Sequence, residues 1–176
     1  MRRPVDADRL RAFMKALARE ARGPLQVYLV GGSTAVLEGW REATIDVDLA
    51  FGESDDAVLR ALPKLKETFD INVELASPAD FIPMKPGWQD RSPFVTQEGV
   101  VTFRHFDLYA QALAKIERGH ELDRQDVQEM LARGLVTRPG LLSYFETIEP
   151  ELYRFPAIDP ASFRNAVTAV VSQAAR

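Results

Sequence analysis

Residues 27–51, VYLVGGSTAVLEGWREATIDVDLAF, decide how the fold of this chain is interpreted. The stretch begins with an apolar run long enough for a buried strand, which the pair Gly31–Gly32 interrupts. A short helix is expected over residues 34–38, with the Ser33 hydroxyl as its N-terminal cap and Gly39 as its end. This order of residues predicts a strand, a tight turn and a helix in immediate succession.

The second half of the stretch alternates strictly between two kinds of side chain, which predicts a strand over residues 45–51. Asp46 and Asp48 share one face of that strand, where two carboxylates repel each other unless a cation lies between them. Mg²⁺ (or Mn²⁺) is the expected ion, because it prefers hard oxygen ligands and typically binds carboxylates together with substrate phosphates. The opposite, apolar face is expected to consist of Ile45, Val47, Leu49 and Phe51.

The glycine turn supplies what a phosphate group needs. Glycines allow close approach of the backbone, and the N–H groups at the start of the following helix point outward at the positive end of its dipole. A Gly-Gly pair can also be an ordinary turn, and an Asp-x-Asp sequence can be a solvated strand end. The two features together, in this order, favour a site that holds a nucleoside triphosphate and its metal ion.

The sequence GGST at 31–34, Arg41 and the run TIDVDL at 44–49 resemble the first motif of the nucleotidyltransferase superfamily that includes DNA polymerase beta. Within that superfamily the chain is similar to small bacterial nucleotidyltransferase-like proteins of unassigned function, which are relatives of abortive-infection toxin nucleotidyltransferases. The resemblance implies that Asp46 and Asp48 bind the metal. It also implies nucleotide contacts from Gly31, Gly32, Ser33, Arg41 and Thr44.

A third strand is expected over residues 71–75, with Asn72 and Glu74 on the face opposite to its apolar side chains. A neighbouring strand could bring Glu74 beside the two aspartates. The superfamily places its third carboxylate on such a strand, where it helps to activate the attacking hydroxyl, so the resemblance implies a catalytic and metal-binding role for Glu74. An exposed strand glutamate is one alternative. Asp80 is the rival third carboxylate, although an acid is common in the first turn of a helix that Ser77–Pro78 would begin.

The row Gln111, Lys115 and Arg118 lies on one face of a helix that Asp107 is expected to cap. Such a row is most simply a solvated face. However, the run from Lys115 to Val127 resembles a later motif of the toxin-type relatives, in which a helix lysine and an arginine precede an Asp-x-x-Asp step. A lysine is a suitable phosphate contact, because it carries a compact charge on a long stem. The resemblance therefore implies that Lys115 holds the triphosphate and that Arg118 shapes the pocket together with Asp123 or Asp126.

Composition sets the remaining limits. The 176 residues are 46% hydrophobic and 27% charged, which is ordinary for a soluble globular protein of one domain or a compact pair. The net charge of −4 provides no overall field that favours nucleic acid. The absence of cysteine excludes disulfides, thiolate catalysis and cysteine-based zinc sites. No apolar run is long enough to span a membrane, so a cytoplasmic protein is expected.

Other expected elements are an amphipathic helix over 6–22, a helix opening at 54–56, a loop over 83–93, a hairpin of 94–97 with 100–106, a helix over 137–148, and a last helix with Phe163, Val167, Val170, Val171 and Ala174 on its inner side. Neither His105 nor His120 is expected to bind metal. The predicted fold class is α/β (α+β). A small mixed sheet with flanking helices occupies residues 1–106, and a helical part packed on it occupies residues 107–176.

The function that this reading favours is metal-dependent transfer of a nucleoside monophosphate from an NTP to an acceptor hydroxyl on an RNA end, a protein or a small molecule. Two alternatives stay open. One is a catalytically reduced binding module, such as a toxin–antitoxin component. The other is a small Asp-x-Asp glycosyltransferase that uses a nucleotide sugar. A partner protein or a homodimer is compatible with each.

Overall fold

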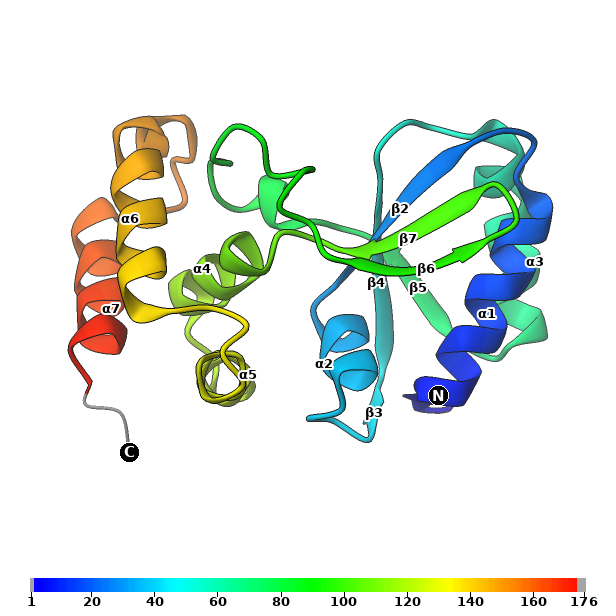
Figure 1. Ribbon diagram of the computed structural model, residues 1–176, viewed down its shortest axis with the longest axis horizontal. Helices are drawn as coiled ribbons and strands as arrows, with labels where there is room; N and C mark the ends of the chain where they lie inside the picture. The colour runs from blue at the N-terminus through cyan, green and yellow to red at the C-terminus, as the bar shows by residue number, and fades with distance from the viewer. Residues whose placement is uncertain (1, 174–176) are drawn as a thin grey trace. The chain divides into compact units, whose positions relative to one another are not determined.

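The computed structural model describes residues 2–173 (Figure 1). The contacts between Cα atoms divide the chain into two compact units. The first unit comprises the described residues up to Ser77 together with Ser92–Phe106, and the second comprises Pro78–Arg91 together with the chain from Asp107 onward. The segment Pro78–Arg91 therefore belongs with the C-terminal helices and not with the sheet that precedes and follows it in sequence.

The first unit is built on a mixed sheet of five strands in the order β5-β4-β2-β7-β6. The pairs β2–β4 and β6–β7 are antiparallel, whereas β2–β7 and β4–β5 are parallel. The strands are β2 (Leu25–Val30), β4 (Asp46–Phe51), β5 (Asn72–Leu75), β6 (Phe94–Glu98) and β7 (Val101–His105). The mixed sheet with flanking helices confirms the predicted fold class.

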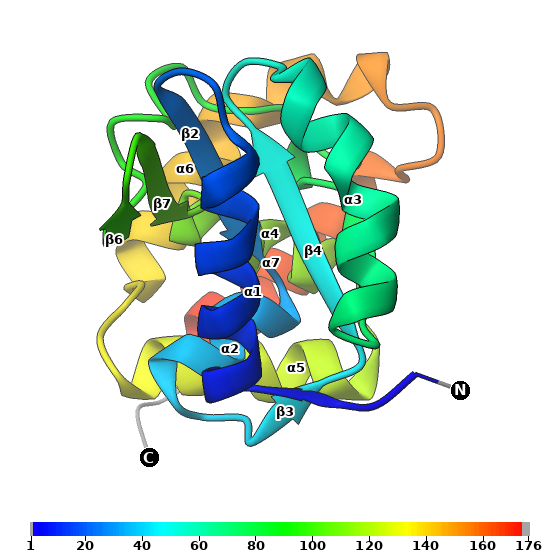
Figure 2. The same ribbon diagram turned by 90° about the vertical axis from the view of Figure 1, so that its right-hand side faces the viewer.

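Two amphipathic helices, α1 (Ala7–Glu20) and α3 (Asp56–Thr68), pack against each other and lie side by side in front of β4 (Figure 2). Each begins at an aspartate whose carboxylate accepts backbone N–H groups, Asp6 for α1 and Asp55 for α3. The fully buried side chains between helices and sheet include Leu10, Phe13, Leu17, Val27, Leu29, Val47, Leu49, Val58 and Phe103. Because this face of β4 packs against the helices, the polar residues of the strand lie on its opposite face.

The turn after β2 differs from the expectation. Helix α2 (Gly32–Glu38) begins at Gly32, and Ser33 lies inside it, so the prediction that Ser33 caps the helix was wrong. Gly31 takes the capping position with φ of +59°, a conformation that lets the chain turn from strand to helix without an intervening polar residue. Gly39 ends the helix, as predicted, and it does so in the left-handed conformation.

The connection between α2 and β4 contains a short strand, β3 (Ala43–Thr44), which pairs antiparallel with β1 (Val5–Asp6). Ile45 follows β3 and is 56% exposed, so its expected place in the core was wrong. Because β4 begins only at Asp46, Ile45 precedes the part of the strand that the helices cover. Val47 and Leu49 are fully buried, and Phe51 is half-buried.

Helix α4 (Leu108–Arg118) is the central element of the second unit, because it contacts α5, α6, α7 and η1. Asp107 caps α4, as predicted, and Thr137 and Asp159 cap α6 and α7. Ala174, expected on the inner side of α7, lies outside the described residues. The other elements are η1 (Pro78–Asp80), α5 (Glu121–Ala132), α6 (Arg138–Ile148), η2 (Glu149–Arg154) and α7 (Pro160–Ser172). None of the helices within residues 2–173 has the length and hydropathy to cross a membrane.

Candidate metal and nucleotide site

The strand register gathers the acidic residues of the first unit on one face of its sheet. In the antiparallel pair, Asp48 lies opposite Val30, the last residue before the glycine turn. In the parallel pair, Asp46 lies opposite Asn72 and Asp48 opposite Glu74. Neighbouring strands are about 4.8 Å apart, and partners in register present their side chains on the same face. Glu74 is therefore adjacent to Asp48, the placement that its position in β5 predicted, while its catalytic role stays a prediction.

Asn72 connects two of these carboxylates. Its Nδ2 lies 2.7 Å from Asp46 Oδ1 and 3.3 Å from Glu74 Oε1. An ionised carboxylate can accept hydrogen bonds but cannot donate them, so the amide nitrogen of Asn72 must be the donor in both contacts, with one hydrogen for each. Asn72 was not among the predicted site residues. The signal that could have found it is its parity, because it shares one face of β5 with Glu74.

The two glycines of the turn lie against the acidic strand and the connection that precedes it. A methyl group at Gly31 would lie 3.2 Å from Asp48 Oδ2. A methyl group at Gly32 would lie only 2.1 Å from Thr44 Oγ1 and 3.5 Å from Arg41 Nη1. A side chain at either position would therefore fill the space in which these polar groups meet. The structure brings the turn, Arg41, Thr44 and Asp48 together, and their roles in nucleotide and metal binding stay predictions.

Two hydroxyl groups complete this end of the sheet. Thr44 Oγ1 donates to the carbonyl oxygen of Asp46 at 3.0 Å, which fixes the start of β4. Ser33 is fully buried, and its Oγ has no hydrogen-bond partner among the described residues. A buried hydroxyl without a partner is unfavourable and calls for a specific reason. Ser33 is wrong as a helix cap, and its predicted contact with a nucleotide stays a prediction.

The donor set fits a divalent ion only in part. Within residues 2–173, no three or more His, Asp or Glu side chains are grouped so that they could hold a metal ion. Asp46 and Asp48 nevertheless offer hard oxygen ligands from one strand face, and Mg²⁺ usually combines one or two carboxylates with phosphate oxygens. The pair therefore fits an ion that arrives with a nucleotide, while the Asn72 amide binds one oxygen of Asp46 and one oxygen of Glu74.

A buried histidine ties α2 to the end of β7. His105 Nε2 lies 2.9 Å from Glu38 Oε1, and Nδ1 lies 3.1 Å from Thr34 Oγ1. Burial lowers the pKa of His105, although the Glu38 carboxylate opposes the shift. Both partners lie on α2, so this contact orients the helix that follows the glycine turn. This role of His105 was not predictable from the sequence, because the pairing of β7 with β2 is not visible from local spacing.

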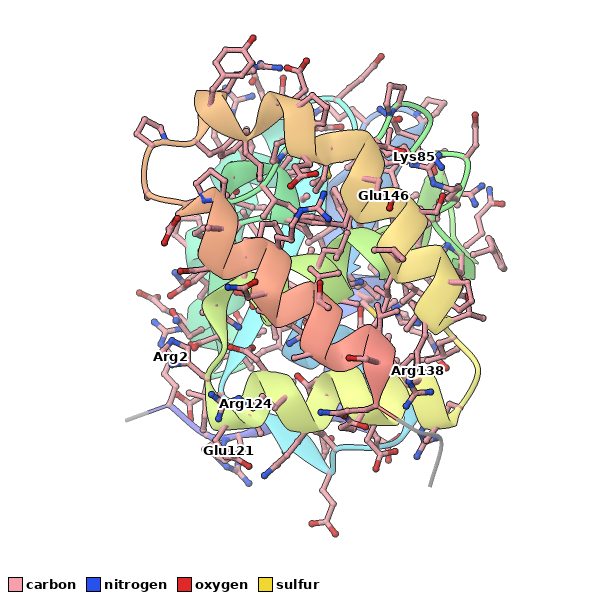
Figure 3. All side chains as sticks on the ribbon, turned by 90° about the vertical axis from the view of Figure 1, so that its left-hand side faces the viewer. Arg2, Lys85, Glu121, Arg124, Arg138 and Glu146 are labelled. Atoms are coloured by element: carbon pink, nitrogen blue, oxygen red, sulfur yellow. The ribbon has the colours of Figure 1, made fainter. Side chains whose placement is uncertain are left out.

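In the second unit, Lys115 is only 7% exposed. A solvated helix face, the simplest explanation of the row Gln111, Lys115 and Arg118, was therefore wrong for Lys115. Its Nζ lies 2.7 Å from Asp126 Oδ2 and 3.6 Å from Asp123 Oδ1. Arg118 completes the cluster, with Nε 2.8 Å from Asp123 Oδ2. By contrast, the pair Glu121–Arg124 of the same helix α5 is exposed at the surface (Figure 3).

The four predicted nucleotide-binding residues of the helical part are thus brought together as an ion-pair cluster within the second unit. Burial disfavours the charge on Asp123, but Arg118 and Lys115 keep its pKa below the usual range. Lys115 also lines a pocket of about 320 Å³ between α4, α5 and α7. The role of this cluster in nucleotide binding stays a prediction. Asp80, the rival third carboxylate, belongs to η1 in this unit.

Comparison with known proteins gives three results. No curated protein matches the chain. Among solved structures, an antigenic nucleotidyltransferase-like protein from Paracoccidioides brasiliensis is similar over 95% of this chain and 95% of its own, with 16% identity and a TM-score of 0.44. A family model, described as nucleotidyltransferase of unknown function (DUF6036), matches residues 8–148, which include the sheet, the glycine turn, the acidic strand and the Lys115 cluster. The chain therefore belongs to this family of nucleotidyltransferases of unknown function.

Proposed function

We propose that this protein transfers a nucleoside monophosphate from an NTP to an acceptor hydroxyl and releases pyrophosphate. The observation that supports the proposal best is the register of β4, which has the glycine turn on one side of Asp48 and Glu74 on the other. A phosphate-binding turn and two metal-binding acids at adjacent positions are what this reaction needs. Membership of the nucleotidyltransferase family supports the same chemistry.

In this proposal each group has a separate task. Asp46 and Asp48 hold a Mg²⁺ or Mn²⁺ ion, which when bound neutralises phosphate charge and stabilises the leaving oxygen. The backbone at Gly31 and Gly32, together with Arg41, donates to the phosphate oxygens, and Thr44 holds the start of β4 in place. Little covalent chemistry falls to the protein in such reactions, so positioning and charge neutralisation carry most of the catalysis.

Glu74 is the proposed base. Its place beside Asp48 allows it to accept the proton of the attacking hydroxyl once that hydroxyl is bound near the metal. The bond that forms joins the acceptor oxygen to the α-phosphorus, and the bond that breaks joins the same phosphorus to the oxygen of the leaving pyrophosphate. Asp80 lies in the other unit, so no strand register relates it to the two aspartates.

A ligand-dependent thermal shift tests the binding half of this proposal. The midpoint of the wild-type protein should rise when Mn²⁺ and a non-hydrolysable NTP are added together, because both bind the native state. Replacing Asp46 and Asp48 by Asn should abolish that rise. The control replaces Asp8 and Asp56 by Asn, which removes the same charge from exposed first turns of α1 and α3. A full rise in the Asp46/Asp48 variant would contradict the proposed metal site.

The reaction itself is tested with labelled NTPs and a cell extract as the source of acceptors. Transfer of label from the α-phosphate to a macromolecule or small molecule, with release of pyrophosphate, is the expected result. Release of a nucleoside diphosphate from a nucleotide sugar would indicate glycosyl transfer instead. Binding of nucleotide and metal with no transfer to any acceptor would indicate a binding module.

A further inference from the structure

His105, the last residue of β7, contacts both the first and the last turn of helix α2. The residue is 3% exposed, with its Nδ1 3.1 Å from Thr34 Oγ1 and its Nε2 2.9 Å from Glu38 Oε1. Thr34 and Glu38 are separated by one helical turn, so their side chains lie on the same face of α2. The imidazole ring therefore holds the helix that follows the glycine turn.

The Thr34 hydroxyl connects this ring to the other side of the glycine turn. Thr34 Oγ1 lies 3.3 Å from the carbonyl oxygen of Leu29 in β2. Leu29 is the register partner of His105, and its carbonyl also accepts the N–H group of Phe106 at 2.9 Å. The two glycines lie between Leu29 and Thr34 in the chain, so a bond from the hydroxyl to this carbonyl closes the turn.

The single hydrogen of the Thr34 hydroxyl has two acceptors within reach. The ionised Glu38 carboxylate can only accept, so Nε2 of His105 carries a hydrogen. In the neutral ring Nδ1 is bare and accepts the hydroxyl hydrogen of Thr34. In the protonated ring Nδ1 donates to Thr34 Oγ1, and the hydroxyl donates to the Leu29 carbonyl. Protonation thus moves one hydrogen bond onto the carbonyl that precedes the glycine turn, without displacing a heavier atom.

We propose that His105 is a positioning residue whose protonation closes the glycine turn and strengthens nucleotide binding. The inference rests on the proposed function, which places the triphosphate at Gly31 and Gly32. A closed turn holds its N–H groups ready for the phosphate oxygens, and a positive charge beside α2 favours the triphosphate. By reciprocity, a bound nucleotide strengthens proton binding by His105 by the same factor.

The groups that face the ring accommodate both charge states. Helix α2 presents the Glu38 carboxylate and the Thr34 hydroxyl, and β2 presents the backbone of Leu29. Before β6, the Pro93 carbonyl accepts the backbone N–H group of His105 at 2.8 Å. Burial lowers the pKa of His105, although Glu38 opposes the shift. The ring is therefore mainly neutral at pH 7 without nucleotide and can gain a proton when nucleotide binds.

The test follows the ring of His105 by NMR. The chain contains two histidines, and the ring signal that is missing from the spectrum of His105→Gln identifies His105. The pKa of His105 is measured in the wild-type protein with and without a non-hydrolysable NTP and Mg²⁺. The nucleotide should raise this pKa by an amount that corresponds to about fivefold tighter proton binding or more. An unchanged pKa would overturn the inference.

Nucleotide affinity gives the reciprocal measurement. Relative to His105→Gln, the wild-type protein should gain about fivefold in NTP affinity between a pH above the pKa of His105 and a pH below it. Comparison with His105→Gln at each pH removes the effect of ionisation of the phosphates themselves. The titrations should be limited to pH values at which circular dichroism shows both proteins to be folded. A constant ratio of the two affinities would contradict the coupling.

Variants of Thr34 test the hydroxyl. Thr34→Val keeps the shape of the side chain and should abolish the rise in pKa, whereas Thr34→Ser keeps the hydroxyl and should retain it. Thr147→Val is the control, because Thr147 Oγ1 donates to the Ser143 carbonyl at 2.9 Å, a bond of the same kind in the other unit. A full rise in Thr34→Val would show that the nucleotide charge acts on the ring without the turn, which would overturn the inference.

The inference and the proposed function fail in different ways. A wild-type protein that binds no nucleotide with Mg²⁺ at any pH would overturn the proposed function and the inference with it. Nucleotide binding that leaves the pKa of His105 unchanged would overturn the inference alone.

Discussion

Lys115 and Asp126 form an ion pair in the interior of the second unit, with 2.7 Å between Nζ and Oδ2 and almost no exposure of either side chain. Asp123 is the second acid beside the ammonium, and it is shared with Arg118. Charged side chains are rarely buried unless they are paired, so each member of this cluster depends on the others. Truncation of a single side chain of this cluster should therefore destabilise the packing of α4 against α5.

Lys115→Ala should lower the free energy of unfolding by about 3–5 kcal/mol, because it leaves Asp126 as a buried charge without its cation. Urea denaturation gives the difference directly. Lys64→Ala is the matched control, since Lys64 is an exposed helix lysine whose loss should cost no more than about 0.5 kcal/mol. Equal effects in the two variants would show that the ion pair contributes no stability.

The same lysine carries the predicted contact with a triphosphate. If that contact exists, Lys115→Ala should weaken binding of a non-hydrolysable NTP with Mg²⁺ by about ten- to a hundredfold, as expected for a charge-assisted bond. The titration should be carried out at a temperature well below the thermal unfolding midpoint of the variant, so that loss of fold is not mistaken for loss of affinity. A nucleoside without phosphates should be affected far less. Wild-type affinity for the NTP would limit Lys115 to its structural ion pair.

Glu74→Gln separates catalysis from binding. The variant should lose transfer activity and keep its binding of Mn²⁺ and nucleotide, because the amide cannot accept the proton of the acceptor hydroxyl. Asp80→Asn should retain transfer, since Asp80 has no register contact with the acidic strand. The reverse pattern would identify Asp80 as the third carboxylate.

Gly32→Ala tests the close approach at the turn. The added methyl group would lie 2.1 Å from Thr44 Oγ1 and 2.8 Å from its Cβ, so the backbone of α2 or β3 must shift. Overpacking of this kind typically costs about 1–3 kcal/mol. Gly23→Ala is the control, because a methyl group there meets nothing within 4 Å. Equal stabilities of the two variants in urea would show that Thr44 can move away without cost.

The pairing of His105 with Glu38 and Thr34 predicts a dependence of stability on pH. Burial lowers the pKa of His105 from 6.5, so the folded protein binds its proton less readily than the unfolded chain does. The contribution of His105 to stability is thus complete above pH 6.5 and is lost as the pH falls through the folded-state pKa. Relative to His105→Gln, the wild-type protein should lose stability as the pH falls below about 6.5, the usual pKa of an unfolded-chain histidine.

Much of the fold could be predicted because its determinants are local. Alternation of side chains gave the two faces of β4 and β5, and their common parity indicated that Glu74 could reach Asp48. Aspartate and threonine caps marked the starts of most helices. Ser33 was misplaced because the positive φ of Gly31, which lets the helix start two residues earlier, is not encoded in the spacing of polar residues.

The rest depends on partners that are distant in sequence. The bond of Asn72 to Asp46 requires the register of two strands separated by α3, which periodicity does not specify. Lys115 looks like a surface residue when only α4 is considered, and the acids that allow its burial come from α5. Ile45 fits the alternation of β4 but precedes the strand that the helices cover.

The assignment of Pro78–Arg91 to the helical unit has a consequence for how the protein can be divided. The chain crosses between the two units three times, after Ser77, after Arg91 and after Phe106. A fragment that stops at Phe106 would retain Arg91 without the Asp107 carboxylate that binds its Nε at 3.0 Å. A fragment that stops at Ser77 would lack β7, the parallel neighbour of the central strand β2. Neither unit is a contiguous piece of the gene product, so during synthesis the sheet stays incomplete until the ribosome has passed both the loop of the other unit and β7.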